Sequence, residues 1–320
     1  GGVVFGGVSD RIGRAKTMIF TILFYSIFTC LSAFSQEPWH MVVLRFLVAM
    51  GVGGEWAVAS AMVAEVMPKR SRPVMSSIFH ASSVFGTLLA AATIALLIGN
   101  QELNARLAER GVDGWRVGFA IGVLPALLTL WIRWKLREPE SWTAARDRAK
   151  EDGTQPTGRI GELFSPAHLR NTIIGVTLAT IGLVTFWGGH IYGKNALMRK
   201  AQTEALKAEQ ITTDADKKVK AEAFEKHKSV IKRAEMTSMT LNTIGAGLGL
   251  VLFGGISNRL GRKGAFVLYH AMAFVMMLVL FKGLIANDAS KVALMVCLPI
   301  FGFFTVGMHA GYAVYFPELF

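Results

Sequence analysis

Long apolar runs separated by short polar loops organise most of the chain. Because about twenty helical residues, at 1.5 Å of rise each, match the roughly 30 Å hydrocarbon core of a bilayer, each run predicts a membrane-spanning helix. Residues 1–5 indicate the end of one further helix. The pattern therefore predicts an all-α polytopic membrane protein. Its eight complete spans are 18–34, 41–63, 74–98, 117–136, 172–192, 236–253, 265–285 and 292–316.

Two polar segments interrupt this pattern. Residues 137–170 contain Pro, Gly and mixed charge, which is typical of a solvated linker. Residues 194–235 are rich in Ala, Glu and Lys and predict two helices outside the bilayer, with Thr213 or Asp214 as a helix start. This insert is either a solvated charged lid or a segment that captures a partner or substrate.

Charge fixes the expected orientation. The net charge is +12, and 52% of the residues are hydrophobic. Lys and Arg collect in alternate short loops, around 11–16, 69–72 and 259–263, whereas the intervening loops are poorer in them. This asymmetry is typical of cytoplasmic loops in a multi-pass protein of the cell (inner or plasma) membrane. The Lys and Arg residues do not form the single basic face that a nucleic-acid partner would require, so no nucleic-acid binding is expected.

A glycine-rich basic stretch occurs twice, as GGVSDRIGRAK at 6–16 and GGISNRLGRKG at 254–264. Both copies resemble the signature loop of the major facilitator superfamily, Gly-x-x-x-Asp-Arg-x-Gly-Arg-(Arg/Lys), and the second copy has Asn where the pattern has Asp. The positions concerned are Gly6, Asp10, Arg11, Gly13 and Arg14, and then Gly254, Asn258, Arg259, Gly261 and Arg262.

Other stretches resemble further elements of the same superfamily: RFLVAMGVGGEW, AEVMPKRSR, REPESW and YFPELF. The resemblance points towards its sugar-porter and metabolite–proton symporter branches. It implies two pseudo-symmetric six-helix halves, here an incomplete chain that lacks helix 1, most of helix 2 and helices 11–12. The expected domains are an N-terminal half at 1–136, a cytoplasmic linker at 137–170 and a C-terminal half at 171–320 that carries the insert 194–235.

Charged residues at the cytoplasmic helix ends form one candidate site. The resemblance implies that Asp10, Arg14, Glu65 and Arg72 form a latch that closes the cytoplasmic gate, since paired Arg and carboxylate groups have a specific geometry. Arg262 and Glu318 would be the counterpart in the second half. The alternative is that these charges are solvated and only set topology.

Ionisable residues inside the spans form a second candidate site, because they are costly there and usually line a pathway. Arg45 resembles the fourth-helix partner of a proton-binding Asp, and a structural ion pair is its alternative. Glu55, beside Trp56, is expected to bind a proton, contact a polar substrate or lock neighbouring helices together.

Histidine and aromatic residues complete the expected pathway. The resemblance places Trp187, His190, His309 and Tyr312 on helices that line the central cavity, with interfacial anchoring as the alternative. His80 and His270 are interpreted as packing residues. Gly51, Gly53 and Gly54 predict close helix contacts. The histidine spacing does not indicate a metal site.

These observations favour a secondary active transporter of a small polar metabolite, a sugar or an organic acid, that works by alternating access with H⁺ symport. A transport-inactive nutrient sensor on the same fold, a uniporter and an antiporter are the alternatives. The sequence shows no Ser/His/Asp set or metal cluster that would indicate an enzyme, and no cofactor is expected. The expected partners are the substrate, H⁺ and the lipid bilayer, and the protein is expected to be monomeric.

Overall fold

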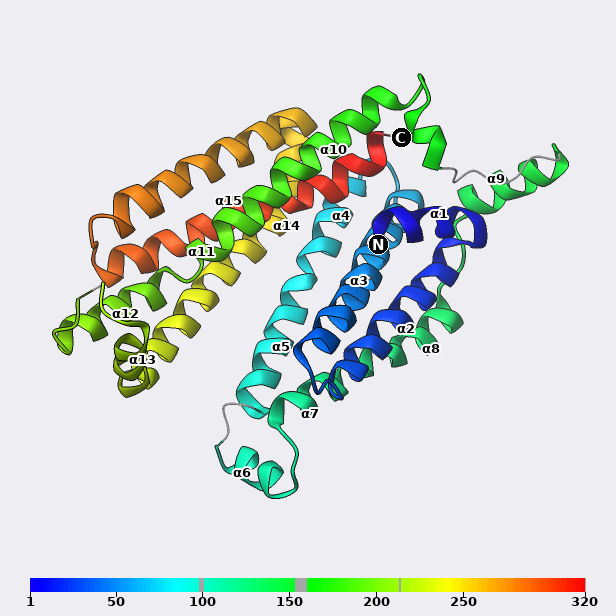
Figure 1. Ribbon diagram of the computed structural model, residues 1–320. Helices are drawn as coiled ribbons and strands as arrows, with labels where there is room; N and C mark the ends of the chain where they lie inside the picture. Colours follow the sequence, from blue (N-terminus) through cyan, green and yellow to red (C-terminus); the bar gives the residue numbers. More distant parts are fainter. Residues whose placement is uncertain (98–100, 153–159, 213, 320) are drawn as a thin grey trace. The chain divides into compact units, whose positions relative to one another are not determined.

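The computed structural model describes residues 1–97, 101–152, 160–212 and 214–319, and the secondary structure of this part is entirely helical. The prediction of an all-α fold is therefore confirmed. The chain divides into two compact units (Figure 1). The first consists of Gly1–Pro68 and Phe85–Thr172, and the second of Lys69–Val84 and Ile173–Phe320.

The first unit is built around α2 and α3, which pack along one another. Gly51 of α3 makes this approach possible, because an added Cβ would lie 2.9 Å from Cβ of Tyr25. One turn later, a Cβ at Gly54 would overlap the ring of Phe5, so the predicted close contacts exist at both positions. The helices of this unit are α1 (Gly2–Ile12), α2 (Arg14–Ser32), α3 (Pro38–Val66), α5 (Ser83–Leu97), α6 (Gln101–Glu109), α7 (Gly114–Ile121), α8 (Leu128–Lys135) and α9 (Glu140–Glu151).

The second unit is built around α14 and α15, with α4 and α12 packed against both. Two π-helical segments, η3 (Thr185–His190) and η4 (Val279–Ile285), continue its helices. The α-helices are α4 (Arg72–Ala81), α10 (Leu169–Val184), α11 (Ile191–Gly193), α12 (Ala196–Ala208), α13 (Lys217–Lys226), α14 (Lys228–Leu278) and α15 (Lys291–Leu319).

Helix α14 supplies two spans rather than one. It contains 51 residues, and Gly261 has non-helical torsions (φ 76°, ψ 164°) at which the chain doubles back (Figure 1). The hydroxyl of Tyr269 in the returning arm donates to the carbonyl of Gly249 in the first arm at 3.0 Å. Seven helices of the described residues are long and apolar enough to cross a membrane. Because one of the seven is this two-armed helix, they account for the eight predicted runs.

The two repeated stretches are helical, and the expectation that they are loops is wrong. Residues 6–12 continue α1, Arg14 already begins α2, and only Gly13 between them departs from helical geometry, with φ 112°. The second copy lies inside α14, where Gly261 is the corresponding break. Positive φ is accessible to glycine at little cost, so one glycine is sufficient to reverse the chain between two spans.

The predicted span 74–98 is also divided. Helix α4 ends at Ala81 and α5 begins at Ser83, and the two helices belong mainly to different units. The hydroxyls of Ser82 and Ser83 donate to the carbonyls of Phe79 and His80. Serine side chains that bond the preceding turn compete with the helical ladder, which favours a break here.

The insert contains the two expected helices, α12 and α13, and also the beginning of α14 at Lys228. Helix α13 begins at Lys217, later than predicted. Asp216 caps it by accepting from the backbone N–H of Lys218 at 3.0 Å. Of the two predicted starts, Asp214 therefore lies before the helix, and Thr213 lies outside the described residues. A side chain directly before a helix can satisfy its first free N–H groups, which explains the choice of Asp216.

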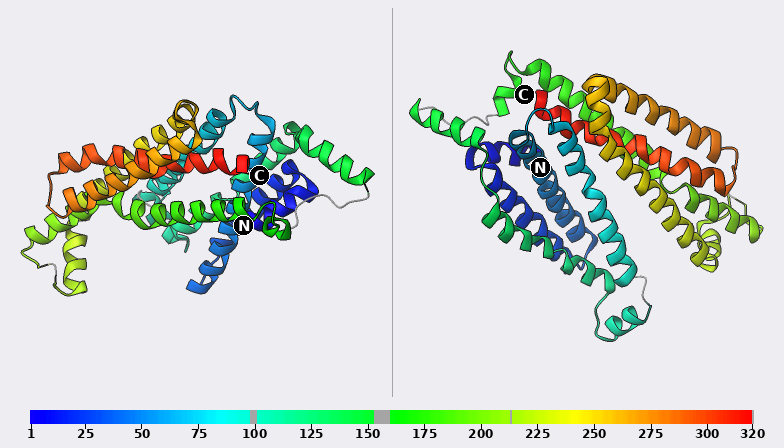
Figure 2. Two further views of the ribbon diagram at one scale, coloured as in Figure 1. Left: turned by 90° about the horizontal axis from the view of Figure 1, so that it is seen from above. Right: turned by 180° about the vertical axis from the view of Figure 1, so that it is seen from behind.

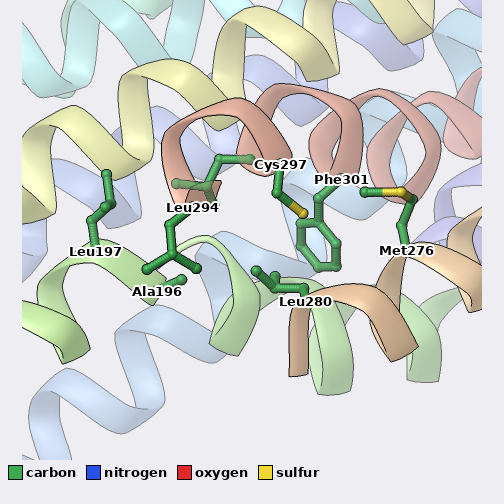
Figure 3. Close-up of a cluster of buried hydrophobic side chains, with 8 residues drawn as sticks. Ala196, Leu197, Met276, Leu280, Leu294, Cys297 and Phe301 are labelled. Atoms are coloured by element: carbon green, nitrogen blue, oxygen red, sulfur yellow. The ribbon is translucent and has the colours of Figure 1, made fainter. Parts of the chain in front are cut away.

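Helix α12 is part of the core of the second unit. The description of the insert as a solvated lid therefore does not fit this helix. Ala196 and Leu197 are 1% and 5% exposed and pack with Leu294 and Phe301 of α15 and Leu280 of η4 (Figure 3). Figures 1 and 2 show α12 and α13 at the end of the unit where η4 leads into α15. Full burial of a leucine contributes about 2 kcal/mol.

An ion-pair cluster fastens the same helix to the segment that precedes α15. Asp288 accepts from Lys200 at 2.9 Å and from Lys207 at 2.7 Å. Hydrogen bonds from Lys207 and then Lys200 lower the pKa of Asp288 from 3.8 to about 2. The stabilisation is therefore fully present above the ordinary pKa and is lost only as the pH falls through about 2.

Replacing Asp288 with Asn is expected to lower the thermal unfolding temperature of the detergent-solubilised protein. The decrease should be the same at pH 5.5 and pH 7.5, since Asp288 is ionised at both. Thermal unfolding at the two pH values measures this directly. Replacing exposed Asp152, at the C-terminal end of α9, is the control and should have little effect. A decrease that disappears at pH 5.5 would contradict the assignment.

Candidate functional site

An ion-pair cluster in the first unit joins α1, α2 and α3. Arg14, the first residue of α2, donates from Nη1 to Oδ1 of Asp10 at 2.5 Å. Its Nε and Nη2 both donate to Oε1 of Glu65 on α3, at 3.1 and 2.8 Å. The side chain of Arg14 is only 13% exposed. One guanidinium therefore neutralises two carboxylates in a partly desolvated place, where charge-assisted hydrogen bonds are strongest.

Glu138 extends this cluster, although the sequence interpretation did not select it. It accepts from the backbone N–H groups of Ala15 and Lys16 at 3.1 and 3.3 Å, so its carboxylate caps the N-terminus of α2. A Cβ at position 13 would overlap this carboxylate, and the φ of 112° at Gly13 favours glycine there. The signal was present in the stretch REPESW, which contains Glu138.

Trp142 ties α9 to the same place. Its indole Nε1 donates to the carbonyl of Asp10 at 3.0 Å, and the guanidinium of Arg146 lies 5.4 Å from the centroid of its ring. The segment after α8 thus closes over the end of α1. We call Asp10, Arg14, Glu65, Glu138 and Trp142 the Arg14 cluster.

The second copy of the motif repeats part of this arrangement with a neutral partner. Nη1 of Arg262 lies 3.3 Å from both Oγ of Ser257 and Oδ1 of Asn258. In the first copy, Nη1 of Arg14 binds Ser9 at 2.6 Å in the same way. Glu318 lies on α15, and its side chain falls outside the described residues.

The remaining motif residues have separate positions. Arg11 and Arg259 are exposed, which suits a role in topology. Gly254 lets α4 approach α14, because a Cβ there would lie 2.7 Å from the carbonyl oxygen of Pro73. Gly6 has no such close neighbour. Arg72 begins α4 and belongs to the second unit, so its membership of the latch stays a prediction.

The predicted pathway residues of the first unit lie along α3. Arg45 is exposed, with its guanidinium 5.8 Å from the centroid of the Phe119 ring. Glu55 and Trp56 are half-buried. Glu55 lies within electrostatic range of the phenol of Tyr25 on α2. Ionisable groups inside a span are costly and usually face a pathway or a partner.

In the second unit, His190 is a buried residue rather than an interfacial anchor. It is 5% exposed, its Nδ1 lies 2.9 Å from Oγ1 of Thr305, and its ring stacks on Phe301 at 5.8 Å. Trp187 lies three residues earlier in η3, and its side chain falls outside the described residues.

Four side chains from three helices form a polar group nearby. The rings of His309 and Tyr312, both on α15, lie 5.7 Å apart, and His309 stacks on His80 of α4 at 6.4 Å. Nε2 of His270, on α14, lies 3.1 Å from the hydroxyl of Tyr312. His80 and His270 had been interpreted as packing residues, but the fold brings them to the predicted pathway residues. The described residues contain no group of three His, Cys, Asp or Glu that is placed to hold a metal ion.

Comparison with known proteins gives a consistent result. The family model "Sugar (and other) transporter" matches residues 1–161. A putative metabolite transport protein of Haemophilus influenzae is 26% identical over 99% of this chain and 68% of its own length. The sialic acid transporter NanX of Escherichia coli is 29% identical over 88% of this chain and 58% of its own length. A probable 4-methylmuconolactone transporter of Cupriavidus pinatubonensis is 24% identical over 100% of this chain and 64% of its own length.

The fold is similar to that of a transporter of known structure. The proton:xylose symporter XylE, a major facilitator protein, superposes with a TM-score of 0.60 at 17% identity, over 98% of this chain and 68% of that one. The chain thus spans between 58% and 68% of the lengths of these relatives. The family match over residues 1–161 and the seven membrane-length helices lead to the same conclusion. The chain belongs to the sugar (and other) transporter family of the major facilitator superfamily and is an integral membrane protein.

Proposed function

We propose that the protein is a secondary active transporter that moves a small organic acid by alternating access, coupled to H⁺ symport. The match of residues 1–161 to a transporter family carries this proposal. In such proteins two halves move about a site near the middle of the bilayer. The halves proposed here are 1–136 and 171–320, joined by the linker 137–170, in a protein that works as a monomer.

The substrate class is proposed from the names of relatives. The matches include transporters of sialic acid, cis,cis-muconate, gentisate and niacin. All four are carboxylic acids, and they differ in size and ring content, so the shared chemistry is a carboxylate on a small polar molecule. A sugar is the second candidate, because the XylE structure is that of a proton:xylose symporter.

Solute counterflow distinguishes these candidates without requiring a pH gradient. Vesicles that contain the purified protein are preloaded with one unlabelled compound and then given the same compound labelled, in trace amount. We expect exchange with at least one of the four acids and none with xylose. Exchange with xylose alone would support the sugar instead, and exchange with none of the compounds would refute the proposed substrate class.

Arg45 and Glu55 are proposed to carry the proton-coupled step, with Trp56, Trp187, His190, His309 and Tyr312 along the pathway. Replacing Glu55 with Gln keeps the shape of the side chain and removes its titration. Uptake that depends on a pH gradient should fall at least tenfold, whereas counterflow should persist. Loss of both activities would indicate a substrate-binding or structural role for Glu55. Replacing Glu109 with Gln, at the C-terminal end of α6, is the control and should leave both activities unchanged.

The motif copies are proposed to face the cytoplasm of a cell or inner membrane, because they carry the excess of Lys and Arg. The Arg14 cluster would then hold the cytoplasmic side of the transporter shut. Neutralising Glu65 as Glu65→Gln removes one of the two carboxylates on Arg14 and should shift the protein away from outward-facing states. Labelling of a single cysteine in the outer cavity should slow several-fold. Unchanged labelling would contradict the latch.

A further inference from the structure

Lys194 is a half-buried cation at the junction between the segment that contains His190 and the insert. It directly follows α11, and its backbone N–H donates to the carbonyl oxygen of His190 at 2.9 Å, so the chain is helical between the two residues. Side chains four residues apart on a helix share a face. The ammonium of Lys194 accordingly lies within electrostatic range of the imidazole of His190. Lys194 is therefore on the same side of this segment as a predicted pathway residue.

Neighbouring helices hold the backbone at Lys194 in place. Its carbonyl oxygen accepts from the hydroxyl of Ser238 on α14 at 2.6 Å, and the same hydroxyl oxygen accepts from the backbone N–H of Leu197 at 3.4 Å. One residue before the lysine, Gly193 lies so close to the ring of Phe301 that an added Cβ would overlap it. A ligand that binds to a fixed group loses less conformational freedom in binding. The base of the Lys194 side chain is pre-organised in this sense.

Lys194 has no carboxylate partner in the part of the chain that the structure describes. Three other cations, Arg14, Arg116 and Lys200, are half-buried in the same way, and each of them donates to a carboxylate. Taking a cation partly out of water costs free energy, which a nearby negative charge offsets. Lys194 thus differs from these three cations in lacking the anion that would offset this cost.

The carboxylates of α12, of the first two turns of α14 and of the segment before α15 are already paired. Glu204 of α12 accepts from Lys291 at 2.6 Å, and Glu235 of α14 accepts from Lys232 at 2.8 Å. Asp288 holds two lysines, as described above. These three acids are thus engaged by other cations. A carboxylate for the remaining half-buried lysine has to come from another molecule.

We propose that Lys194 binds the carboxylate of a small organic acid, which is the substrate of the transporter. An ammonium donates charge-assisted hydrogen bonds to carboxylate oxygens, and these are about twice as strong as hydrogen bonds between neutral groups. Lys194 thereby selects an acid over its amide, because the amide has the same shape but carries no charge. No covalent bond forms or breaks. The identity of the ligand as the substrate rests on the proposed function, whereas the binding of a carboxylate at Lys194 does not.

Protection of the Lys194 amine from acetylation tests the site in the purified protein without measuring transport. The protein is treated briefly with an amine-acetylating reagent, alone or with increasing sialic acid, cis,cis-muconate, gentisate or niacin, and peptide mass spectrometry gives the acetylated fraction of each lysine. We expect at least one acid to slow acetylation of Lys194 several-fold and saturably. Nicotinamide, the neutral amide of niacin, should not protect it. Equal acetylation of Lys194 with and without every one of these acids would overturn the proposal.

Lys217, measured in the same samples, is the matched control. It lies in the same insert, at the start of α13, and it too has no carboxylate partner among the described residues, but it is exposed. Acetylation of Lys217 should be the same with and without each acid. Equal protection of Lys217 and Lys194 would mean that the acids do not distinguish the half-buried lysine from a surface lysine, and the site would be refuted.

Counterflow of the protecting acid then tests whether the bound carboxylate is that of the substrate. In Lys194→Gln the concentration for half-maximal exchange should rise about tenfold or more, because a charge-assisted contact is lost, and Lys194→Arg should retain most of the affinity. Lys217→Gln removes the same charge from the insert and should match the wild type. An unchanged concentration in Lys194→Gln, or an equal rise in Lys217→Gln, would refute a direct contact with the substrate. Absence of exchange in the wild type refutes the proposed function, and the protection experiment still decides the site.

Discussion

Replacing Arg14 with Met is expected to lower the free energy of unfolding by about 2–3 kcal/mol. The substitution leaves Asp10 and Glu65 side by side without their shared cation, and removing one partner of a desolvated ion pair costs several kcal/mol. We take the lower end because the two carboxylates are 33% and 24% exposed. Thermal or denaturant unfolding of the solubilised protein measures the loss.

The control for this prediction is an exposed pair of the same chemistry. Arg106 and Glu102 form an ion pair one helical turn apart, with side chains 71% and 75% exposed. Solvent screens such a pair, so Arg106→Met should cost less than about 0.5 kcal/mol. Equal losses for Arg14→Met and Arg106→Met would mean that the Arg14 cluster contributes no more to stability than a surface ion pair.

Replacing Gly249 with Leu is expected to destabilise the protein by about 4 kcal/mol or more, enough to prevent folding of the second unit. A Cβ at this position would lie 2.8 Å from the carbonyl carbon of Phe303 and 2.9 Å from its Cα. These are backbone atoms of α15 and cannot turn aside as a side chain would. Gly245 meets the backbone of Pro299 in the same way one turn earlier, so two glycines four residues apart allow the helices to touch.

Gly255 provides the matched control, six residues further along the same helix. It has no described atom within 4 Å of an added Cβ and is exposed, so Gly255→Leu should be neutral or slightly stabilising. Leucine has a higher helix propensity than glycine and transfers more favourably into the lipid bilayer. Folded yield and unfolding temperature of the two variants give the comparison. A Gly249→Leu protein as stable as the wild type would contradict the close contact of α14 and α15.

The spans could be predicted because the thickness of the bilayer sets their length and its hydrocarbon core requires apolar side chains. The turns could not be predicted, because the glycines and charges of the motif at 6–16 are typical of a loop. In the structure, Gly13 is the one residue between α1 and α2 with non-helical torsions, and the chain changes direction there. The insert was misjudged for a related reason: Ala196, Ala201 and Ala205 are small and do not stand out among charged residues, but they form the buried face of α12.

Some residues of the candidate site could likewise be predicted from the sequence, and others could not. Arg14, Asp10 and Glu65 could be brought together from the motif resemblance, because the pairing chemistry of arginine and carboxylate is specific. Glu138 and His270 could not. Their partners are backbone atoms of distant segments, the N–H groups after Gly13 and, through Tyr312, the carbonyl of Leu178. Backbone partners leave no mark in the sequence.

We propose that the protein couples the movement of its substrate to that of protons. The most direct test is accumulation of the exchanged acid in vesicles that contain the purified protein, with an imposed pH gradient, acidic outside. We expect the acid to accumulate well above its outside concentration. An agent that collapses the gradient should abolish this accumulation and leave counterflow unaffected. Uptake to the same level with and without the gradient would contradict it.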